Sequence, residues 1–298
     1  MLERQTYPVI TVVIPSYNQG KYIEETLLSV LGQNYPHLEV IVIDGGSTDH
    51  TVEILQAYDD QIAYWHSQPD QGQSDAINQG MRRSSGQVLC WLNSDDMYLP
   101  GTLLDIGLKF RDRTAEMLVI HGGGLTINQD LGSLASDAQI SMPIDKQMLT
   151  YQNPILQPST FWTRSLWDKV GELNVSLDYV MDWDWFVRAA QVGQFEYAPR
   201  FYSIYRYHDD HKTSSGGEQR RQEIATMVSK YASDYWSDLF RTVDENYQDV
   251  VAKVKLMNSI SFLPKRHLLW KLLSPQKLSE LKSFWDLIAV LNVYGLNN

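Results

Sequence analysis

The stretch that decides the fold of this chain is Val9-Ile10-Thr11-Val12-Val13-Ile14-Pro15-Ser16-Tyr17-Asn18. Its first six residues are all β-branched, as is typical of a strand that is covered on both faces of a sheet. Pro15 cannot donate a hydrogen bond to a neighbouring strand, so we expect the strand to end there. A short polar segment follows directly.

The same alternation of an apolar strand and a helix-spaced segment recurs over the first hundred residues. We expect strands at residues 9–14, 38–43, 62–65 and 87–92, and helices at residues 22–31, around 52–55 and at 74–83. This alternation predicts an α/β fold with a Rossmann-like, doubly wound and mostly parallel sheet. Ligands bind such sheets outside the carboxyl ends of the strands, so the polar segments there are the candidates for chemistry.

After residue 100 the pattern becomes less regular. We expect a helix at residues 101–111, a strand at 117–120, loops over 122–153 that allow a hairpin, a helix at 182–192 and strands at 195–198 and 201–207. From about residue 214 the sequence is helical and has no strand pattern. The chain is therefore expected to consist of a domain over residues 1–215 and a helical C-terminal extension over residues 216–298.

The composition limits the function. The formal net charge is −11, which argues against binding nucleic acid over a broad surface, because such binding needs many Lys and Arg side chains. The single cysteine, Cys90, lies in an apolar run and is interpreted as a small buried side chain rather than a nucleophile. No run reaches the roughly 18 apolar residues that span a bilayer, and the first residues lack the apolar stretch of a signal peptide. We expect a cytoplasmic protein.

Asn93-Ser94-Asp95-Asp96 directly follows the apolar run at residues 88–92. Such a strand is buried, so its end delivers a carboxylate to the mouth of the sheet, where Mg²⁺ or Mn²⁺ would find the oxygen ligands that they favour. The alternative is a turn whose Asp and Asn side chains bond to the local backbone. The tetrapeptide alone leaves both open.

Two other polar segments lie near the expected strand ends. Asp44-Gly45-Gly46 would allow a carboxylate to accept a hydrogen bond from a base or a ribose, although an ordinary strand-to-turn segment has the same composition. Asp70-Gln71-Gly72 places a glycine turn ahead of the next helix, which Ser74 or Asp75 is suited to cap. Asn78 lies inside that helix, where it has a propensity cost and needs a partner.

Four motifs occur together, in one order and at one spacing. They are VVIPSYN at residues 12–18, VIDGGSTD at 42–49, Asp70-x-Gly72 with Ala76-x-Asn78-x-Gly80, and WLNSDD at 91–96. In this combination the chain resembles the family 2 glycosyltransferases of the GT-A fold, specifically over residues 9 to about 100 and more weakly to about 215. The resemblance implies a nucleotide-sugar-binding half at residues 1–100 and an acceptor half at residues 101–215.

The resemblance also implies a donor site. Asp95 would bind Mn²⁺ or Mg²⁺, with Asp96 near the sugar or the diphosphate. Asn93 stands at the first position of the family's Asp-x-Asp motif, which leaves the site one charge poorer, although a neutral oxygen or a water bridge would still serve. The nucleotide-sugar-binding residues implied in this way are Pro15, Ser16, Tyr17, Asn18, Asp44, Gly45, Ser47, Asp70, Gly72, Asn78, Asn93, Ser94 and Asp96.

The acceptor half resembles the family at two further segments. Residues 177–188 resemble its acidic segment, by which Asp182 is the catalytic base that takes the proton of the acceptor hydroxyl, and Asp184 caps or orients the helix. Residues 205–211 resemble its Arg-x-His segment, by which His208 is a further metal ligand or bonds to the diphosphate, and Arg206 helps to neutralise the diphosphate. The indoles of Trp162, Trp183 and Trp185 would stack on sugar faces, or belong to the core, as tryptophans more often do.

The C-terminal residues 251–298 carry seven Lys or Arg and two acidic residues, a net charge of +5. Leu and Trp are mixed with Lys in this tail. It would rest as an amphipathic helix on an anionic membrane surface, or pack against the acidic core or a second subunit.

We therefore expect an inverting glycosyltransferase that moves a sugar from a UDP-, dTDP- or GDP-sugar to a hydroxyl of a glycan or lipid-linked acceptor. Its setting would be cell-surface polysaccharide biosynthesis, in the cytoplasm or on the inner face of the membrane. Two alternatives stay open. A non-catalytic nucleotide-sugar-binding protein is supported only by Asn93, and a sugar-phosphate nucleotidylyltransferase is disfavoured because the first strand is not followed by a Gly-rich basic loop.

Overall fold

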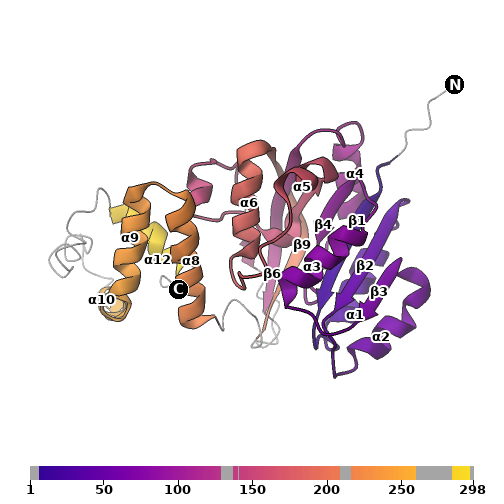
Figure 1. Cartoon of the computed structure of the whole chain (residues 1–298), viewed down its shortest axis with the longest axis horizontal. Coiled ribbons are helices and arrows are strands. Elements are labelled where there is room, and N and C mark those ends of the chain that lie inside the picture. The colour runs from indigo at the N-terminus through magenta and orange to yellow at the C-terminus, as the bar shows by residue number, and fades with distance from the viewer. Residues whose placement is uncertain (1–6, 129–136, 140, 209–215, 260–283, 296–298) are drawn as a thin grey trace. The chain divides into compact units, whose positions relative to one another are not determined.

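The computed structural model describes residues 7–128, 137–139, 141–208, 216–259 and 284–295 (Figure 1). The chain divides into two compact units, one of residues 1–144 and 154–215, the other of residues 145–153 and 216–298. The division after residue 215 lies where the sequence pattern changes to helix alone. No pattern in the sequence indicates that residues 145–153 join the second unit.

The first unit contains a nine-stranded sheet in the order β3-β2-β1-β4-β8-β6-β9-β5, with β7 paired to β6. Its first four strands pair in parallel, as the alternating sequence pattern predicts. They are β1 (Ile10–Ser16), β2 (Leu38–Asp44), β3 (Tyr64–Ser67) and β4 (Val88–Trp91). The helices of this half are α1 (Ile23–Leu31), α2 (Thr51–Ala57) and α3 (Gln73–Arg83), and η1 (Asp59–Gln61) is a 3₁₀ turn.

Strand β1 is longer than expected. It continues through Pro15 to Ser16, and in the parallel register Pro15 lies beside Ile43 of β2. The missing N–H of Pro15 is tolerated because it stands near the end of the strand. The correction moves the strand end two residues closer to the site.

The second half of the sheet adds antiparallel pairs. Strand β8 runs antiparallel to β4 and β6, whereas β6 and β9 run parallel to each other. The elements are β5 (Met97–Tyr98), β6 (Leu118–Asn128), β7 (Asp137–Gln139), β8 (Thr160–Thr163), β9 (Gln194–Tyr207), α4 (Thr102–Phe110), α5 (Arg164–Val170), α6 (Met181–Val192) and the 3₁₀ turn η3 (Gln157–Ser159). Two expectations were wrong here, since residues 122–128, expected as a loop, are the second part of β6, and the two strands expected at 195–207 are one strand. The hairpin allowed over residues 122–153 agrees with the antiparallel pairing of β6 and β7.

A bulge explains the second error. His121 pairs with Tyr197, but the next pair is Gly123 with Phe201, so β9 contributes more residues than β6 across this step. Pro199, which cannot donate to a ladder, lies inside the bulge. The sequence pattern therefore predicts two strands, although the chain forms the single strand β9.

The core of the first unit is packed against the central strands. Val12, Ile14 and Cys90 on the strands are fully buried together with Ile23 of α1 and Phe110 of α4. Burial raises the pKa of the Cys90 thiol to about 12, which agrees with its interpretation as a small apolar side chain rather than a nucleophile.

The second unit is helical in all the elements that the structure describes. They are η2 (Met148–Thr150), α8 (Gly217–Tyr231), α9 (Asp234–Glu245), α10 (Tyr247–Ser259) and α12 (Phe284–Val293). Val228, Phe240 and Leu287 are buried, and the ring of Tyr151 stacks on Trp236 with centroids 3.8 Å apart. This stack explains why residues 145–153 belong to this unit. The membrane and dimer expectations rest on the basic, Leu-rich tail at residues 251–298, of which residues 260–283 and 296–298 lie outside the described residues.

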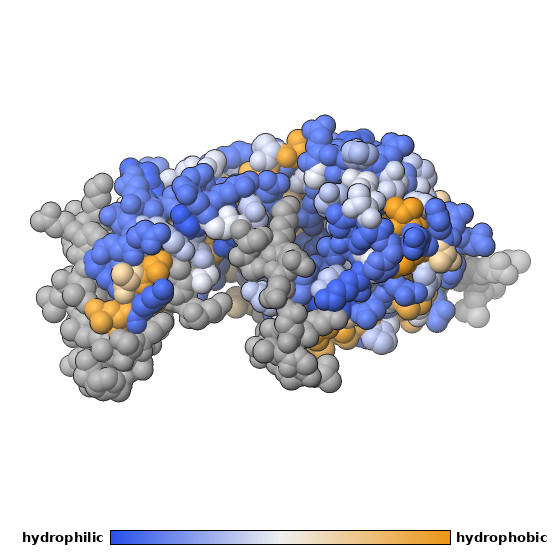
Figure 2. All heavy atoms as spheres, turned by 90° about the horizontal axis from the view of Figure 1, so that it is seen from below, coloured by the Kyte–Doolittle hydropathy of each residue, from blue (hydrophilic) through white to orange (hydrophobic). Residues whose placement is uncertain are grey.

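Among the described helices, none combines the length and the apolar character that a bilayer crossing requires. Figure 2 shows one face of the molecule, on which the described side chains are mainly hydrophilic and the hydrophobic ones form small patches.

Candidate active site

A cavity of about 800 Å³ lies at the carboxyl ends of the four parallel strands. Residues that follow β1, β2, β3 and β4 all contribute to its wall, which is the arrangement that ligand sites in open α/β sheets adopt. Its lining residues from this half are Pro15, Ser16, Tyr17, Gln19, Gly45, Pro69, Asp70, Gly72, Gln73, Ala76, Trp91, Asn93, Ser94 and Asp95. The second half of the domain contributes Gln139, Ile155, Leu156, Gln157, Pro158, Asp178, Tyr179, Met181, Asp182 and Tyr205.

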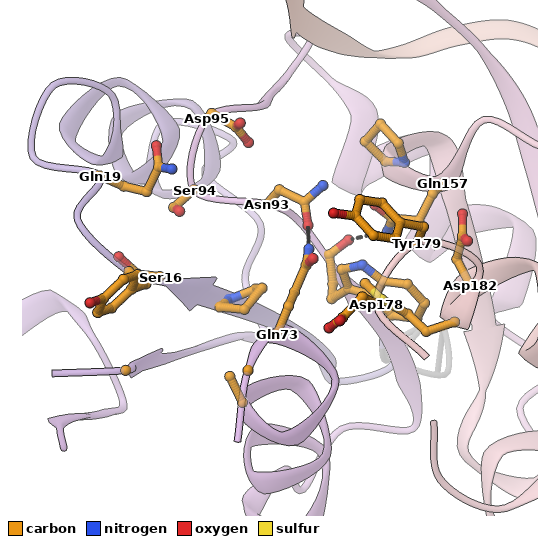
Figure 3. A pocket seen from close by; sticks show the side chains of 18 of the residues that line it. Ser16, Gln19, Gln73, Asn93, Ser94, Asp95, Gln157, Asp178, Tyr179 and Asp182 are labelled. Carbon is orange, nitrogen blue, oxygen red and sulfur yellow. Dashed lines mark hydrogen bonds between the residues drawn. The ribbon is translucent and has the colours of Figure 1, made fainter. Parts of the chain in front are cut away.

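The cavity has two sides. In Figure 3, Ser16, Gln19, Ser94 and Asp95 lie on one side, and Gln157, Asp178, Tyr179 and Asp182 lie on the other. Asn93 and Gln73 stand between them, joined by a hydrogen bond of 2.8 Å from Gln73 Nε2 to Asn93 Oδ1. The fold thus places one acid-bearing wall from each half of the sheet around a shared hollow.

Asp44 does not line this cavity, contrary to the expectation that it holds a base or ribose. Its side chain is fully buried and accepts hydrogen bonds from the backbone N–H groups of Gly46 and Ser47 and from the hydroxyls of Ser47 and Ser67. A carboxylate with four such donors is satisfied. Asp44 therefore fixes the loop after β2, and Gly45 is the residue of that loop that lines the cavity.

Asn18 and Ser47 have a similar role and are also absent from the cavity wall. Asn18 adopts φ +52°, a left-handed conformation that Asn tolerates better than most residues. Its backbone N–H donates to Ser47 Oγ over 2.7 Å, and its side-chain oxygen accepts from the backbone N–H of Thr48 over 2.9 Å. The loops after β1 and β2 are thereby tied to each other.

Asp70 is the acidic side chain of the wall after β3. It accepts a hydrogen bond of 2.8 Å from the N–H of Gly72, and burial, more than the neighbouring charges, raises its pKa. Gly72 has φ +99°, which a glycine adopts without strain. At Gly45 the backbone passes close to Asp70, since a Cβ there would lie 3.0 Å from Asp70 Oδ2 and the carboxylate would have to shift slightly.

Asn78 is another expected donor-site residue that does not line the cavity. It is buried, its Nδ2 donates to the carbonyl of Leu173 and its Oδ1 accepts from the N–H of Leu173, both over 2.9 Å. The amide thus imitates a backbone pairing. Asn78 ties α3 to the loop before α6 instead of contacting the cavity.

The turn of residues 93–96, here called the donor turn, carries the metal-site motif. Asn93, Ser94 and Asp95 line the cavity, whereas Asp96 is buried and accepts hydrogen bonds from Asn93 Nδ2 over 3.3 Å and from the backbone N–H of Arg206 over 3.1 Å. Burial and the nearby charge of Asp95 raise the pKa of Asp96 well above its usual range. The expectation that Asp96 contacts the sugar or diphosphate is therefore replaced by a structural role.

His208 lies beside Asp95, with its Nε2 3.1 Å from Asp95 Oδ2. Its ring is buried and packs on Tyr22 with centroids 4.7 Å apart. An imidazole nitrogen and a carboxylate oxygen at this separation fit the donor set that Mn²⁺ accepts. No cluster of three or more His, Cys, Asp or Glu is found among residues that the structure describes.

Arg206, expected to neutralise the diphosphate, is almost entirely buried. Its guanidinium forms an ion pair with Glu25, and its Nε donates to the backbone carbonyl of Asp95 over 2.9 Å. It is not among the residues that line the cavity. Arg206 therefore supports the donor turn from behind.

The opposite wall is formed at the start of α6. Asp182 lines the cavity, and its Oδ1 accepts a hydrogen bond of 2.7 Å from the N–H of Trp183. Asp184 instead is buried and bonds to Arg188 Nε over 2.9 Å, while Arg188 also donates to the carbonyls of Val170 and Glu172. The orienting role expected for Asp184 agrees with this geometry.

The three tryptophans are core residues, not sugar-stacking platforms. Trp162, Trp183 and Trp185 are at most 4 % exposed. Trp162 and Trp185 pack on each other with centroids 4.9 Å apart, and Trp91 packs on Trp162 at 5.2 Å. Of these four, only Trp91 reaches the cavity wall.

Several lining residues were not predicted as site residues. Asp178 and Tyr179 lie in the acidic segment at residues 177–188 from which Asp182 was predicted. That segment was therefore the sequence feature from which they could have been predicted as well. Gln157 donates from Nε2 to the carbonyl of Trp91 over 2.9 Å and thereby joins the end of β4 to the η3 turn. Gln19 and Gln73 lie outside the motif positions, and Tyr205 begins the segment at residues 205–211 that was interpreted through Arg206 and His208. Tertiary folding brings all three residues to the wall.

Comparison with known proteins agrees with this geometry. The model of the family described as glycosyl transferase family 2 matches residues 11–168, just over half of the chain. The putative teichuronic acid biosynthesis glycosyltransferase TuaG of Bacillus subtilis is 40 % identical over 94 residues, which cover 30 % of this chain and 37 % of that protein.

Two solved structures share the fold. S. aureus TarS 1–349 in complex with UDP-GlcNAc has a TM-score of 0.58 at 18 % identity, over 96 % of this chain and 80 % of that one. The mannosyltransferase PcManGT from Pyrobaculum calidifontis, in complex with GDP-Man and Mn²⁺, has a TM-score of 0.58 at 17 % identity, over 98 % and 87 %. The chain has the GT-A fold and belongs to glycosyl transferase family 2.

Proposed function

We propose that this glycosyltransferase moves a sugar from a nucleoside-diphosphate sugar to a hydroxyl group of a glycan or lipid-linked acceptor, with inversion at the anomeric carbon. The observation that carries the proposal is the shared cavity, whose walls present Asp95 from one half of the domain and Asp182 from the other. The first wall is the donor side and the second the acceptor side. The UDP-GlcNAc and GDP-Man of the two structural neighbours support a nucleotide-sugar donor.

Asp95 and His208 are the residues that would hold Mn²⁺ or Mg²⁺, as the Mn²⁺ of the mannosyltransferase neighbour suggests. A divalent ion there supplies positive charge that stabilises the departing nucleoside diphosphate. Ser16, Tyr17, Gly45 and Asp70 would contact the nucleotide, because they form the same wall.

Asp182 is proposed as the general base. As the acceptor oxygen forms its bond to the anomeric carbon, its proton passes to the carboxylate of Asp182, and the bond to the diphosphate oxygen breaks with its electron pair leaving on the diphosphate. Attack from the face opposite the leaving group inverts the anomeric configuration. The hydrogen bond from the N–H of Trp183 holds the Asp182 carboxylate at the cavity wall.

The biological setting is proposed from the relatives. The teichuronic acid relative supports a role in cell-surface polysaccharide biosynthesis, for which nucleotide sugars would be drawn from the cytoplasm. The basic tail would bring the enzyme to the inner face of the membrane or to a second subunit.

A donor screen tests the proposal. Unfolding temperatures are measured with a panel of UDP-, dTDP- and GDP-sugars, with and without Mn²⁺, since a ligand that binds the native state raises stability in proportion to its affinity and concentration. The stabilising donor is then tested for transfer to hydroxyl acceptors. Stabilisation without transfer or donor hydrolysis would favour a binding protein, and pyrophosphate release from a nucleoside triphosphate plus a sugar phosphate would favour a nucleotidylyltransferase.

A further inference from the structure

Every backbone carbonyl of the donor turn lies within hydrogen-bonding distance of a donor, and the carbonyls of Ser94 and Asp96 share the single hydroxyl hydrogen of Thr26. The Asn93 carbonyl accepts from the N–H of Asp96 over 3.0 Å. The carbonyls of Ser94 and Asp96 lie 2.9 Å and 2.7 Å from the hydroxyl of Thr26, and the carbonyl of Asp95 accepts from Arg206. The path of the turn, and with it the direction of the Asp95 side chain, is therefore set by groups outside the cavity.

Thr26 is unusual for its place on α1. It is fully buried within the stripe that also contains Ile23, Leu27 and Val30, where an amphipathic helix normally presents apolar side chains. A buried hydroxyl needs a hydrogen-bond partner, and the partners of this one are the two carbonyls of the donor turn. The Thr26 side chain thereby connects helix α1 to the donor turn.

Arg206 holds the same turn from strand β9. Its Nε donates to the Asp95 carbonyl, its backbone N–H donates to the Asp96 carboxylate, and its guanidinium lies 5.1 Å from the ring of Tyr22. A buried guanidinium is retained only where its donors and charge are matched, and Glu25 of α1 supplies the opposite charge.

We infer that Thr26 and Arg206 are positioning residues, which act on the donor through the donor turn and not by contact. Neither lines the cavity, and their hydrogen bonds to the turn converge on the backbone on either side of Asp95. The inference rests on the proposed function, because it assigns Asp95 to the donor side. It predicts that loosening the turn weakens donor binding without affecting the acceptor.

A matched pair of substitutions tests this role. Thr26→Val keeps the shape of the side chain and removes the hydroxyl that bonds to the turn. Thr102→Val makes the same change at another buried threonine, whose hydroxyl donates over 2.7 Å to the carbonyl of Tyr202 and which lies outside the cavity wall. Both variants lose one buried hydroxyl, so they separate a general loss of stability from an effect on the turn.

Donor KM, acceptor KM and the binding of the nucleoside diphosphate are measured for each variant, the last by calorimetry with and without Mn²⁺. Thr26→Val is expected to raise donor KM and the nucleotide Kd by about threefold to tenfold, the equivalent of one lost hydrogen bond, at unchanged acceptor KM. Thr26→Ser, which restores the hydroxyl, is expected to return both to wild-type values. Thr102→Val is expected to lower the unfolding temperature and to leave donor KM and the nucleotide Kd unchanged.

The inference would be overturned if Thr26→Val and Thr102→Val changed donor KM and the nucleotide Kd equally. It would also be overturned if Thr26→Val changed neither donor KM nor the nucleotide Kd. If Thr26→Val does not fold, Arg206→Lys is measured in its place, since it keeps the charge near Glu25 and loses the fixed geometry of the Nε contact to the Asp95 carbonyl. The result then expected is the same selective rise in donor KM. A wild-type protein that neither binds nor turns over any nucleotide sugar would instead reject the proposed function.

Discussion

His208 Nε2 lies 3.1 Å from Asp95 Oδ2, although 113 residues separate them in the sequence. One residue belongs to the turn after β4, and the other follows β9, so only the completed sheet brings them together. The histidine is 2 % exposed and the aspartate 17 % exposed, which leaves the carboxylate as the member that faces the cavity. We propose this pair as the place where a divalent ion would bind on the donor side.

Removing the Asp95 charge is expected to abolish the effect of metal on donor binding. Asp95→Asn loses the charge that a divalent ion favours, so Mn²⁺ should no longer increase the stabilisation that the nucleotide sugar gives in thermal unfolding. Asp112→Asn, at an exposed surface position, is the control. An unchanged Mn²⁺ affinity of Asp95→Asn in calorimetry would place the metal elsewhere.

Asn93→Asp is expected to weaken donor binding although it restores the acid of the family motif. The new carboxylate would lie at hydrogen-bonding distance from Asp96, where Asn93 now donates over 3.3 Å, and two carboxylates at that distance repel unless a cation lies between them. Donor KM should rise severalfold. Asn174→Asp serves as the control. The side-chain oxygen of Asn174 accepts hydrogen bonds from the N–H and the hydroxyl of Ser176, and a carboxylate can accept the same bonds. Tighter donor binding by Asn93→Asp would contradict this interpretation.

Asn78→Ala is expected to lower stability and to leave donor KM unchanged. The substitution leaves the buried N–H and carbonyl of Leu173 without the amide that pairs with both. Two lost buried hydrogen bonds correspond to about 2–4 kcal/mol, measured as the free energy of unfolding in urea. A rise in donor KM under conditions where the variant is folded would return Asn78 to the donor site.

His121 is expected to make the stability depend on pH. It is fully buried with Nδ1 2.8 Å from Ser141 Oγ, and burial lowers its pKa from 6.5 to about 4. Between these values the unfolded chain binds more protons than the folded protein, so this contribution is fully present above pH 6.5 and is lost as the pH falls to about 4. The shift corresponds to about 3 kcal/mol.

The comparison of wild type with His121→Gln isolates this contribution, because the carboxylates titrate in both proteins. The free energy of unfolding should fall less steeply between pH 6.5 and pH 4 in the variant. Parallel pH profiles of the two proteins would show that His121 is not the responsible group.

The sequence was sufficient to predict the parallel half of the sheet and the cavity at its edge. Continuous β-branched runs that are followed by segments with Pro, Gly and Asp are compatible with few structures other than buried strands. Parallel strands then bring their carboxyl ends to one edge of the sheet. Ser16, Asp70, Asn93, Asp95 and Asp182 consequently line the cavity as the motifs implied.

What the sequence could not predict is which polar side chains turn away from the cavity. Asp44 meets Ser67, Asn78 meets Leu173, and Asp96 meets the backbone of Arg206. These partners are 23, 95 and 110 residues away, and local pattern carries no information about such contacts. The motifs therefore indicate where the candidate site lies, whereas tertiary packing determines which of their residues face the cavity.

The most direct test of the account is the rate of sugar transfer by Asp182→Asn, measured together with its donor affinity. The amide of Asn cannot take up the proton of the substrate hydroxyl, so kcat is expected to fall by about 10²–10⁴-fold. The Kd for the nucleotide sugar is expected to stay within a factor of about two. Asp178→Asn, on the same wall, is the matched control and is expected to retain most of the rate. Transfer at the wild-type rate by Asp182→Asn, or a loss confined to Asp178→Asn, would contradict the assignment of the base.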